Sequence, residues 1–392
     1  MADVTNYIDR LVAELCPDGV EYRPLGDAVE YARKREKDGV GVHLYVGVEN
    51  LKSDFLGCSP VSGSKGGIIF QKDDILLGNI RPYLKKMWLS NTEGVSSPDV
   101  LVLRIQENEE GNILAKYLYY ILSLSKFVTY NISHSRGGKM PRGNKVKILE
   151  FEVPVPPMEI QEAVVEILNK FTNLETELEA ELEARILQYE YYRDSLFETL
   201  DCPRNPLGSF AQYSKDRKKD DSTVSVYVGV ENLKSDFQGC IPTESTNPGV
   251  IFRKDDILLG NIRPYLKKMW RADSDGVASP DVLVVRIRDE FSENISSRYL
   301  YHLLASNEFV GYNVAHSRGG KMPRGNKAKI LEFEAPIPPL EEQQRIVDIL
   351  DRFDALTTSL SEGLPAELAA RRSQYEYYRD QLLSFPRKGE NQ

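Results

Sequence analysis

The chain has 392 residues, 41% hydrophobic and 28% charged, which is enough for two or three domains with proper cores. No apolar run approaches the roughly 20 residues of a membrane helix. The first residues lack the basic start of a signal peptide, and the four cysteines form no Cys-x-x-Cys pair, so we predict a cytoplasmic protein without a zinc ribbon. The net charge of −9 argues against nucleic-acid binding only if the charge is evenly distributed.

The first part of the chain has the pattern of a strand-rich domain. Short runs such as HLYVGVENL, GIIF and DVLVLRI are separated by Gly, Pro, Asn and Asp clusters across residues 24–157. One short helix is expected within residues 114–124. We therefore predict an α+β domain over residues 1–157.

Two segments of this domain concentrate positive charge. One reads GNIRPYLKK, and the other, HSRGGKMPRGNK, opens a stretch without acid that extends to residue 147. Glycine lets backbone N–H groups approach a phosphate or a base edge closely, although the Walker pattern is absent. We expect Tyr83 and Trp88 to pack in the core and His134 to be a hydrogen-bonded turn residue. The predicted nucleic-acid contacts are Arg81, Lys85, Lys86, Arg136, Lys139, Arg142, Asn144 and Lys145.

After Pro156 and Pro157 the hydrophobic period becomes that of a long helix. Apolar residues alternate in steps of four and three from Ile160 to Leu178, as in a coiled-coil seam. The proline pair followed by two glutamates is a good helix start. We predict a spacer helix over residues 158–200. Its many acidic side chains would repel the phosphates of a nucleic acid.

The second half of the chain repeats the first. KDDILLGNIRPYLKKMW occurs at residues 72–88 and again, unchanged, at 254–270, and HSRGGKMPRGNK occurs at 134–145 and 316–327. Two long units make a duplicated domain rather than a solenoid. The second domain is predicted over residues 201–339. Its corresponding nucleic-acid contacts are Arg263, Lys267, Lys268, Arg318, Lys321, Arg324, Asn326 and Lys327.

A second helix is predicted over residues 340–386, before a disordered tail at 387–392. Gly363 and Pro365 predict a kink near 363–365, because proline in a helix interior costs about 3 kcal/mol. The two helices can pair antiparallel as a spacer rod between the domains. Positions expected to bind partner subunits are Ile160, Val164, Ile167, Phe171, Tyr189, Ile346, Leu350, Phe353 and Tyr375.

The combination of DDILLGNIRPYLKK, IPPLEEQQRIVDILDRFDAL and GLPAELAARRSQYEYYRD closely resembles the specificity subunits of Type I restriction-modification systems. The resemblance covers nearly the whole chain. It implies two target-recognition domains, each followed by a long helix, in a pseudo-twofold tandem repeat. It also implies double-stranded DNA, two modification (methyltransferase) subunits and, through them, restriction/translocase subunits as partners.

The chain lacks motifs for chemistry of its own. It has no Asn/Asp-Pro-Pro-Tyr/Phe methyltransferase motif, no Walker loop and no HExxH metal spacing, so we predict a non-catalytic subunit without cofactor or metal. Three alternatives remain open: the recognition subunit of a Type II system with a separate methylase-nuclease chain, an enzyme using His134 and Lys139, and a coiled-coil adaptor that does not contact DNA.

The identity of the repeated basic segments makes a further prediction about the target. Domains related by a dyad impose dyad symmetry on the site that they read. Identical reading segments in the two domains therefore predict an interrupted palindrome, with two inverted half-sites around an unread spacer whose length depends on the helices.

Overall fold

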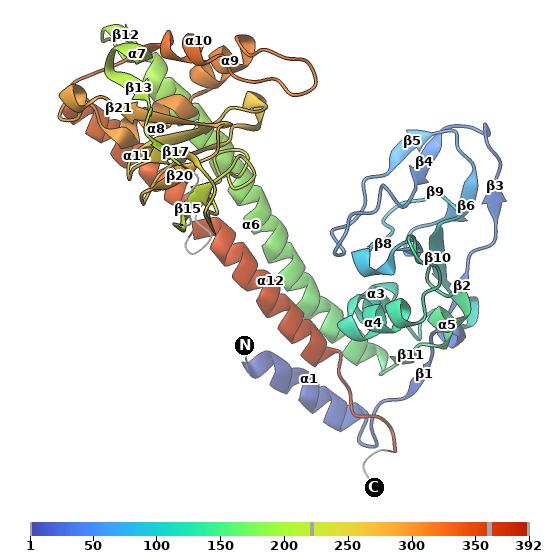
Figure 1. The fold of residues 1–392 in the computed structure, drawn as a ribbon. Helices are drawn as coiled ribbons and strands as arrows, with labels where there is room; N and C mark the ends of the chain where they lie inside the picture. The colour runs from blue at the N-terminus through green and yellow to red at the C-terminus, as the bar shows by residue number, and fades with distance from the viewer. Residues whose placement is uncertain (1, 220–222, 359–362, 390–392) are drawn as a thin grey trace. The chain divides into compact units, whose positions relative to one another are not determined.

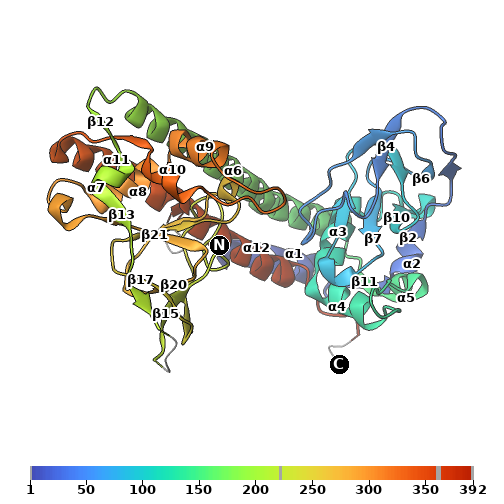
Figure 2. The ribbon, with the colours of Figure 1, turned by 45° about the horizontal axis from the view of Figure 1, so that its top comes forward.

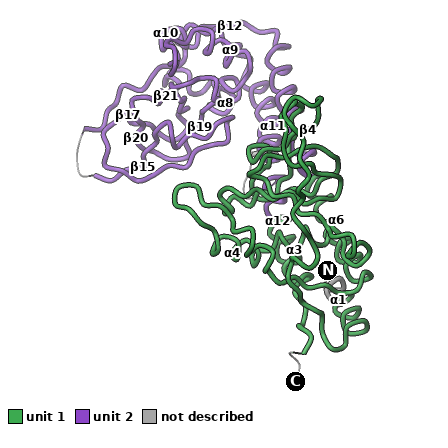
Figure 3. Tube along the Cα trace, turned by 90° about the vertical axis from the view of Figure 1, so that its right-hand side faces the viewer, with its two compact units in different colours: residues 1–176, 370–392 green, residues 177–369 purple. Residues whose placement is uncertain are grey.

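The chain folds into two compact units in the computed structural model, which describes residues 2–219, 223–358 and 363–389. Unit 1 contains residues 1–176 and 370–392, and unit 2 contains residues 177–369 (Figure 3). Each unit combines one copy of the repeated domain with parts of the long helices. Unit 1 is therefore assembled from two segments that are far apart in the sequence.

Unit 1 has a four-stranded sheet of order β2-β10-β7-β8, a five-stranded sheet of order β3-β6-β9-β4-β5 and a two-stranded pair, β1-β11. The five-stranded sheet lies at one end of the domain and α3, α4 and α5 at the other (Figures 1 and 2). The elements are α1 (Ala2–Leu15), β1 (Tyr22–Pro24), α2 (Leu25–Ala28), β2 (Val29–Tyr31), β3 (Arg35–Glu36), β4 (His43–Val46), β5 (Val61–Gly63), β6 (Gly67–Phe70), β7 (Ile75–Gly78), η1 (Pro82–Leu84), β8 (Met87–Leu89), β9 (Gly94–Ser96), β10 (Val100–Ile105), η2 (Glu107–Glu109), α3 (Ala115–Ser123), α4 (Ser125–Ser133), α5 (Lys145–Glu150) and β11 (Glu152–Pro154).

The four-stranded sheet is the centre of unit 1 because its strands are apolar on both faces. All of β7 is buried, and β10 begins with four buried residues in a row. One face joins α3 and the start of α6 in a large core, while the other face, with Leu76 and Val102, packs in a smaller cluster with Phe70. A strand covered on both faces needs a continuous apolar run, which is what these strands have.

Unit 2 repeats this architecture, with sheets β13-β21-β18-β19, β14-β17-β20-β15-β16 and β12-β22. Its elements are β12 (Arg204–Pro206), α7 (Leu207–Phe210), β13 (Ala211–Tyr213), β14 (Arg217–Lys218), β15 (Ser225–Val228), β16 (Thr243–Ser245), β17 (Gly249–Phe252), β18 (Ile257–Gly260), η3 (Pro264–Leu266), β19 (Met269–Arg271), β20 (Gly276–Ala278), β21 (Val282–Ile287), η4 (Asp289–Phe291), α8 (Ser297–Ala305), α9 (Asn307–Ala315), α10 (Lys327–Leu331) and β22 (Glu334–Pro336).

The long helices are α6 (Met158–Glu198, 41 residues), α11 (Leu340–Thr358) and α12 (Gly363–Leu382). Within unit 1, α6 and α12 run antiparallel: Phe171 stacks on Tyr378 with ring centroids 5.7 Å apart, and Glu175 pairs with Arg372 at 2.6 Å. Gly363 begins α12 with a φ of +80°. The region of the predicted kink includes residues 359–362, which lie outside the described residues.

A buried glutamine joins each helix start to its domain. The Gln161 side chain accepts from the Leu114 N–H at 2.9 Å and donates to the carbonyls of Asn112 at 2.9 Å and Pro156 at 2.8 Å. Gln343 makes the corresponding bonds in unit 2 with Ser296, Asn294 and Pro338. Because both glutamines are fully buried, each fixes the direction in which its helix leaves the domain.

The predicted disordered tail at 387–392 is wrong for its first residues. Arg387 forms a parallel bridge with Val20, and the Lys388 N–H donates to the Val20 carbonyl at 3.0 Å. The Arg387 guanidinium also pairs with Glu152. Backbone pairing with an internal segment orders this stretch, and residues 390–392 lie outside the described part. No helix in the described residues has the length and apolar character needed to cross a membrane.

Candidate nucleic-acid interface

The second predicted basic segment forms a narrow loop between α4 and α5. Arg136 and Arg142 close it by exchanging two backbone hydrogen bonds, at 2.9 and 2.8 Å. Gly137 has a φ of +102°, a conformation that favours glycine. The matching loop between α9 and α10, closed by Arg318 and Arg324, projects from unit 2 (Figure 1). The sequence therefore builds the same projecting basic loop twice.

The first predicted basic segment lies beside this loop. The Arg81 N–H donates to the Pro141 carbonyl at 2.7 Å, and the Gly143 N–H donates to the Asn79 carbonyl at 3.1 Å. Ile80 also forms an antiparallel bridge with Arg142. The structure thus brings together the two segments that were separate in the sequence, and unit 2 repeats both hydrogen bonds at the same distances.

Strained backbone gathers at the same place. Arg81, Lys85, Asp54 and Phe55 all have φ between +51° and +61°, although none is glycine. The Asp54 and Phe55 N–H groups donate to the carbonyls of Leu84 and Lys85 at 3.1 and 3.0 Å. Residues held in this region of φ/ψ space cluster at functional sites. The corresponding four residues of unit 2 are strained in the same way: Asp236, Phe237, Arg263 and Lys267.

The predicted cations differ in how available they are to a ligand. Arg136, Lys139 and Lys145 are exposed, and no side chain in the described residues pairs with theirs. Arg142 pairs with Asp99 at 3.2 Å, and Lys85 with Asp54 at 3.5 Å. Unit 2 has the same three exposed and unpaired cations in its described part, Arg318, Lys321 and Lys327. There Arg324 pairs with Asp281 at 3.2 Å and Lys267 with Glu190 at 3.5 Å.

Two predicted contacts in each domain have structural roles. The Lys86 ammonium donates to the Val48 carbonyl at 2.7 Å, and Lys268 donates to Val230 at 2.8 Å. Asn144 and Asn326 cap α5 and α10 through their side-chain oxygens. These structural contacts are a sufficient reason for the same residues to occur in both domains, and no contact with a ligand is needed to explain the repetition. The cap had a visible signal, since asparagine directly before a helical run is a preferred N-cap.

The expectations for the neighbouring aromatic residues and histidine are partly correct. Trp88 packs edge-on against Phe70, and His134 Nδ1 lies 2.9 Å from the Tyr130 carbonyl, so both predictions are confirmed. Tyr83 was expected to pack, but it is 49% exposed beside the basic loop. Met140, which no sequence pattern marked, is 48% exposed in the same loop.

Most of the predicted partner-binding residues contact the chain itself. Ile160, Val164, Ile346 and Leu350 are fully buried in the cores of their units. Their burial argues against direct contact with another subunit. The fully buried row of α6 runs Ile160, Val164, Leu168 in steps of four, and Ile167, which the coiled-coil spacing selected, is partly buried against the same core.

The predicted aromatic positions form matching clusters in the two units. Phe171 contacts Tyr375 and Tyr378 in unit 1. In unit 2, Phe353 stacks on Tyr189 and Tyr192, with ring centroids 6.2 and 5.6 Å apart. Three large side chains that are more than half exposed on the helices were not predicted: Leu187 is 61%, Tyr191 70% and Tyr377 59% exposed.

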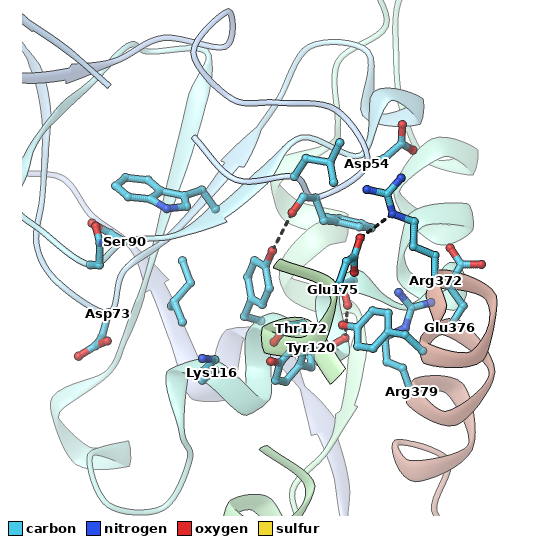
Figure 4. A pocket seen from close by; sticks show the side chains of 18 of the residues that line it. Asp54, Asp73, Ser90, Lys116, Tyr120, Thr172, Glu175, Arg372, Glu376 and Arg379 are labelled. Carbon is cyan, nitrogen blue, oxygen red and sulfur yellow. Dashed lines mark hydrogen bonds and ion pairs between the residues drawn. The ribbon is translucent and has the colours of Figure 1, made fainter. Parts of the chain in front are cut away.

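A cavity of about 720 Å³ separates part of the first domain from its helices. Figure 4 shows Arg372 pointing to Glu175 on one side, with Lys116 and Asp73 on the other. The corresponding cavity of unit 2 is smaller, about 260 Å³. Its described lining contains no metal-type cluster of histidine, cysteine and carboxylate groups, and neither does the rest of the described chain.

The fold defines a class: duplicated α+β domains, attached to long helices, that each present a projecting basic loop. Residues 17–188 and 210–370 both match the family described as the Type I restriction modification DNA specificity domain. The chain belongs to this family. The resemblance stated from the sequence and the predicted fold class are therefore confirmed.

Individual relatives agree with this assignment. The chain is 30% identical to the specificity subunit of the type I restriction enzyme EcoR124I/EcoR124II of Escherichia coli, over 71% of this chain and 73% of that protein. A putative type I restriction enzyme specificity subunit of Haemophilus influenzae is 27% identical over 93% and 96% of the two chains.

Solved structures show the same fold. A chain of a type I R-M system matches with a TM-score of 0.64 at 17% identity, covering 93% of this chain and 97% of that one. The type I restriction-modification S subunit from M. genitalium matches with a TM-score of 0.51 at 13% identity, covering 93% and 96%.

Proposed function

We propose that this chain is the non-catalytic DNA-recognition subunit of a Type I restriction-modification complex in the cytoplasm. Each repeated domain reads one half of a bipartite target in double-stranded DNA. The helices hold two modification subunits, which supply methylation and connect the restriction/translocase subunits. The observation that supports this most strongly is the projecting loop, which together with the first residue of the following helix carries three exposed cations that no described side chain pairs with, in both units of an otherwise acidic protein.

We propose further that the target is an interrupted palindrome. The segments around the interface are identical in the two domains, including GNIRPYLKK and HSRGGKMPRGNK. Each unit also joins the helix that follows its own domain to part of the other repeat's helix, as the matching clusters around Phe171 and Phe353 indicate. Exchange of this kind is expected of two repeats related by a dyad. Identical readers related by a dyad read inverted, near-identical half-sites.

The loops that differ between the domains lie elsewhere. SPVSGSKGG in the first copy corresponds to IPTESTNPG in the second, and LSNTEG corresponds to RADSDG. They include β5 and β16 and the turns before β9 and β20, and both are distant in sequence from HSRGGKMPRGNK, although LSNTEG and RADSDG begin three residues after GNIRPYLKK. A single specified position that differs between the half-sites is therefore compatible with the proposal, whereas unrelated half-sites are not.

Single-molecule sequencing of methylated adenines in cells carrying the complex tests both parts. The expected motif has two inverted half-sites around an unread spacer. Two unrelated half-sites would contradict the symmetry, and the absence of any bipartite motif that depends on this chain would contradict the recognition function.

Inserting LEAE after Ala184 tests the spacer. Four helical residues span about 6 Å, and DNA rises about 3.4 Å per base pair. The preferred spacer should grow by one or two base pairs while both half-sites stay unchanged. A changed half-site would show that the helix does more than set the spacing.

The exposed side chains of α6 are the proposed partner contacts. Leu187 and Tyr191 lie one helical turn apart and are both more than half exposed, in contrast to the fully buried Ile346 and Leu350. Large apolar and aromatic side chains supply much of the binding energy at protein interfaces. We therefore assign the modification-subunit contact to the exposed face of the helix rather than to its buried seam.

A further inference from the structure

The tip of each basic loop carries one large apolar side chain. Met140 is 48% exposed and Met322 is 49% exposed, each next to a proline in the five-residue turn of its loop. The neighbouring Lys139 and Arg142 are exposed cations. Single exposed apolar residues are common on protein surfaces. The methionine has nearly the same exposure in both units. It also lies at a position where a loop that binds only DNA phosphates would carry a polar side chain.

The loop is held so that this methionine stays at the tip. The reciprocal hydrogen bonds between Arg136 and Arg142 close the turn, and the Pro141 carbonyl accepts from the Arg81 N–H at 2.7 Å. A side chain added at Gly138 would meet nothing within 4 Å, so the other side of the turn is open. The result is a narrow loop closed by a single antiparallel bridge, and the major groove of B-DNA admits elements as wide as an α-helix or a two-stranded β-ribbon.

We propose that Met140 and Met322 each contact the 5-methyl group of a thymine in the major groove. This inference rests on the proposed recognition function and names one chemical group that it reads. Thymine is the base that presents a methyl group in that groove, and apolar side chains are its usual contacts. A flexible thioether adapts its shape to such a group. Since about half of the side chain already packs against the protein, its free end suits a methyl contact better than insertion between base pairs.

The test uses the assembled complex and the target obtained by methylome mapping. Each thymine of the half-sites is replaced in turn by deoxyuridine, which removes only the methyl group, and the Kd is measured. One thymine in each half-site should be sensitive, with about fourfold weaker binding, the value for one buried methyl-sized group. Replacing both should weaken binding about fifteenfold, since separate positions are roughly additive.

Variants of the loop identify the side chain responsible. In the Met140→Ala/Met322→Ala complex, uracil and thymine should bind equally well, whereas Met140→Leu/Met322→Leu should retain the preference for thymine. Val146→Ala is the matched control: Val146 is 66% exposed close to the same loop, and the second copy already has alanine there. This control should leave the preference unchanged.

Three results would overturn the proposal. In the first, no thymine of a half-site loses affinity when it is replaced by deoxyuridine. In the second, that replacement weakens binding equally in the wild-type complex and in the Met140→Ala/Met322→Ala complex. In the third, the fluorescence of 2-aminopurine in the target rises only when the methionines are present, which indicates insertion between base pairs. Target binding would remain in all three, so they are distinct from failure of the recognition function. A complex that binds no target at all would remove the recognition function and this inference together.

Discussion

The central prediction concerns the salt dependence of DNA binding. Lys139 and Lys321 are exposed at the tips of the basic loops and pair with no acidic side chain in the described residues. Each is therefore free to neutralise a phosphate and release a counterion. Replacing both by glutamine removes about two phosphate contacts, which should reduce the slope of log affinity against log salt by about 1.8.

The magnitude follows directly from the slope. Between 50 and 200 mM salt, a difference of 1.8 corresponds to about a twelvefold smaller loss of affinity for the variant complex. The variant should therefore be most impaired at low salt and approach the wild type as salt rises. Fluorescence anisotropy with labelled target at four or more salt concentrations measures the slope.

Lys147 and Lys329 provide the matched control. They lie near the same loops, but their ammonium groups pair with Glu150 and Glu332. Replacing them by glutamine should change the slope much less, because each charge is already partly compensated within the protein. Equal slopes for wild type and the Lys139→Gln/Lys321→Gln complex would refute the assignment of these loops to the DNA backbone. Equal effects of the two pairs would refute the distinction between free and paired lysines.

Three other predictions test the helices and their junctions. Gln161→Leu should destabilise unit 1 by about 3 kcal/mol, because three hydrogen bonds with backbone groups are lost. Trp88 fluorescence during urea unfolding in a Trp270→Phe background measures the stability of unit 1, and an unchanged stability would contradict the anchoring role of Gln161. Tyr191→Ala should reduce co-purification of the modification subunit without changing the unfolding midpoint, and normal co-purification would exclude that face. Burial alone would raise the pKa of Asp351, but the hydrogen bond from His302 and nearby positive charge lower it. The stabilising contribution of Asp351 is therefore present above the unfolded pKa of about 3.9 and disappears as pH falls through the lower folded pKa. Asp351→Asn should make unit 2 less sensitive to acid below about pH 4, as measured by Trp270 fluorescence.

Much of the fold was predictable because its signals are local or repeated. The offset between the two copies of KDDILLGNIRPYLKKMW identified the duplication, and the change of period after Pro157 identified α6. The basic character of the two loops was equally visible. Their proximity was not, because it depends on hydrogen bonds such as Arg81 to Pro141 that no sequence period encodes.

The errors have physical causes. Lys86 was predicted as a DNA contact from its charge, but its ammonium is used by the Val48 carbonyl 38 residues away. Ile167 was selected by a coiled-coil spacing, but the surface that α6 contacts here is the domain core, which buries Leu168 fully and Ile167 only in part. A coiled-coil pattern identifies an apolar stripe, and only the tertiary structure shows what covers that stripe.

The composition of unit 1 has a consequence for synthesis. Leu382, Leu383 and Phe385 are buried in the same core as Ile8 and Val20. This core cannot close until residues beyond 370 have left the ribosome, whereas unit 2 is one continuous segment whose residues have all emerged by then. Domains generally fold as units during synthesis. Two domains with nearly the same sequence should therefore mature in reverse order, the second before the first, and a prematurely terminated chain would expose an unfinished first domain to proteases before it could occupy DNA.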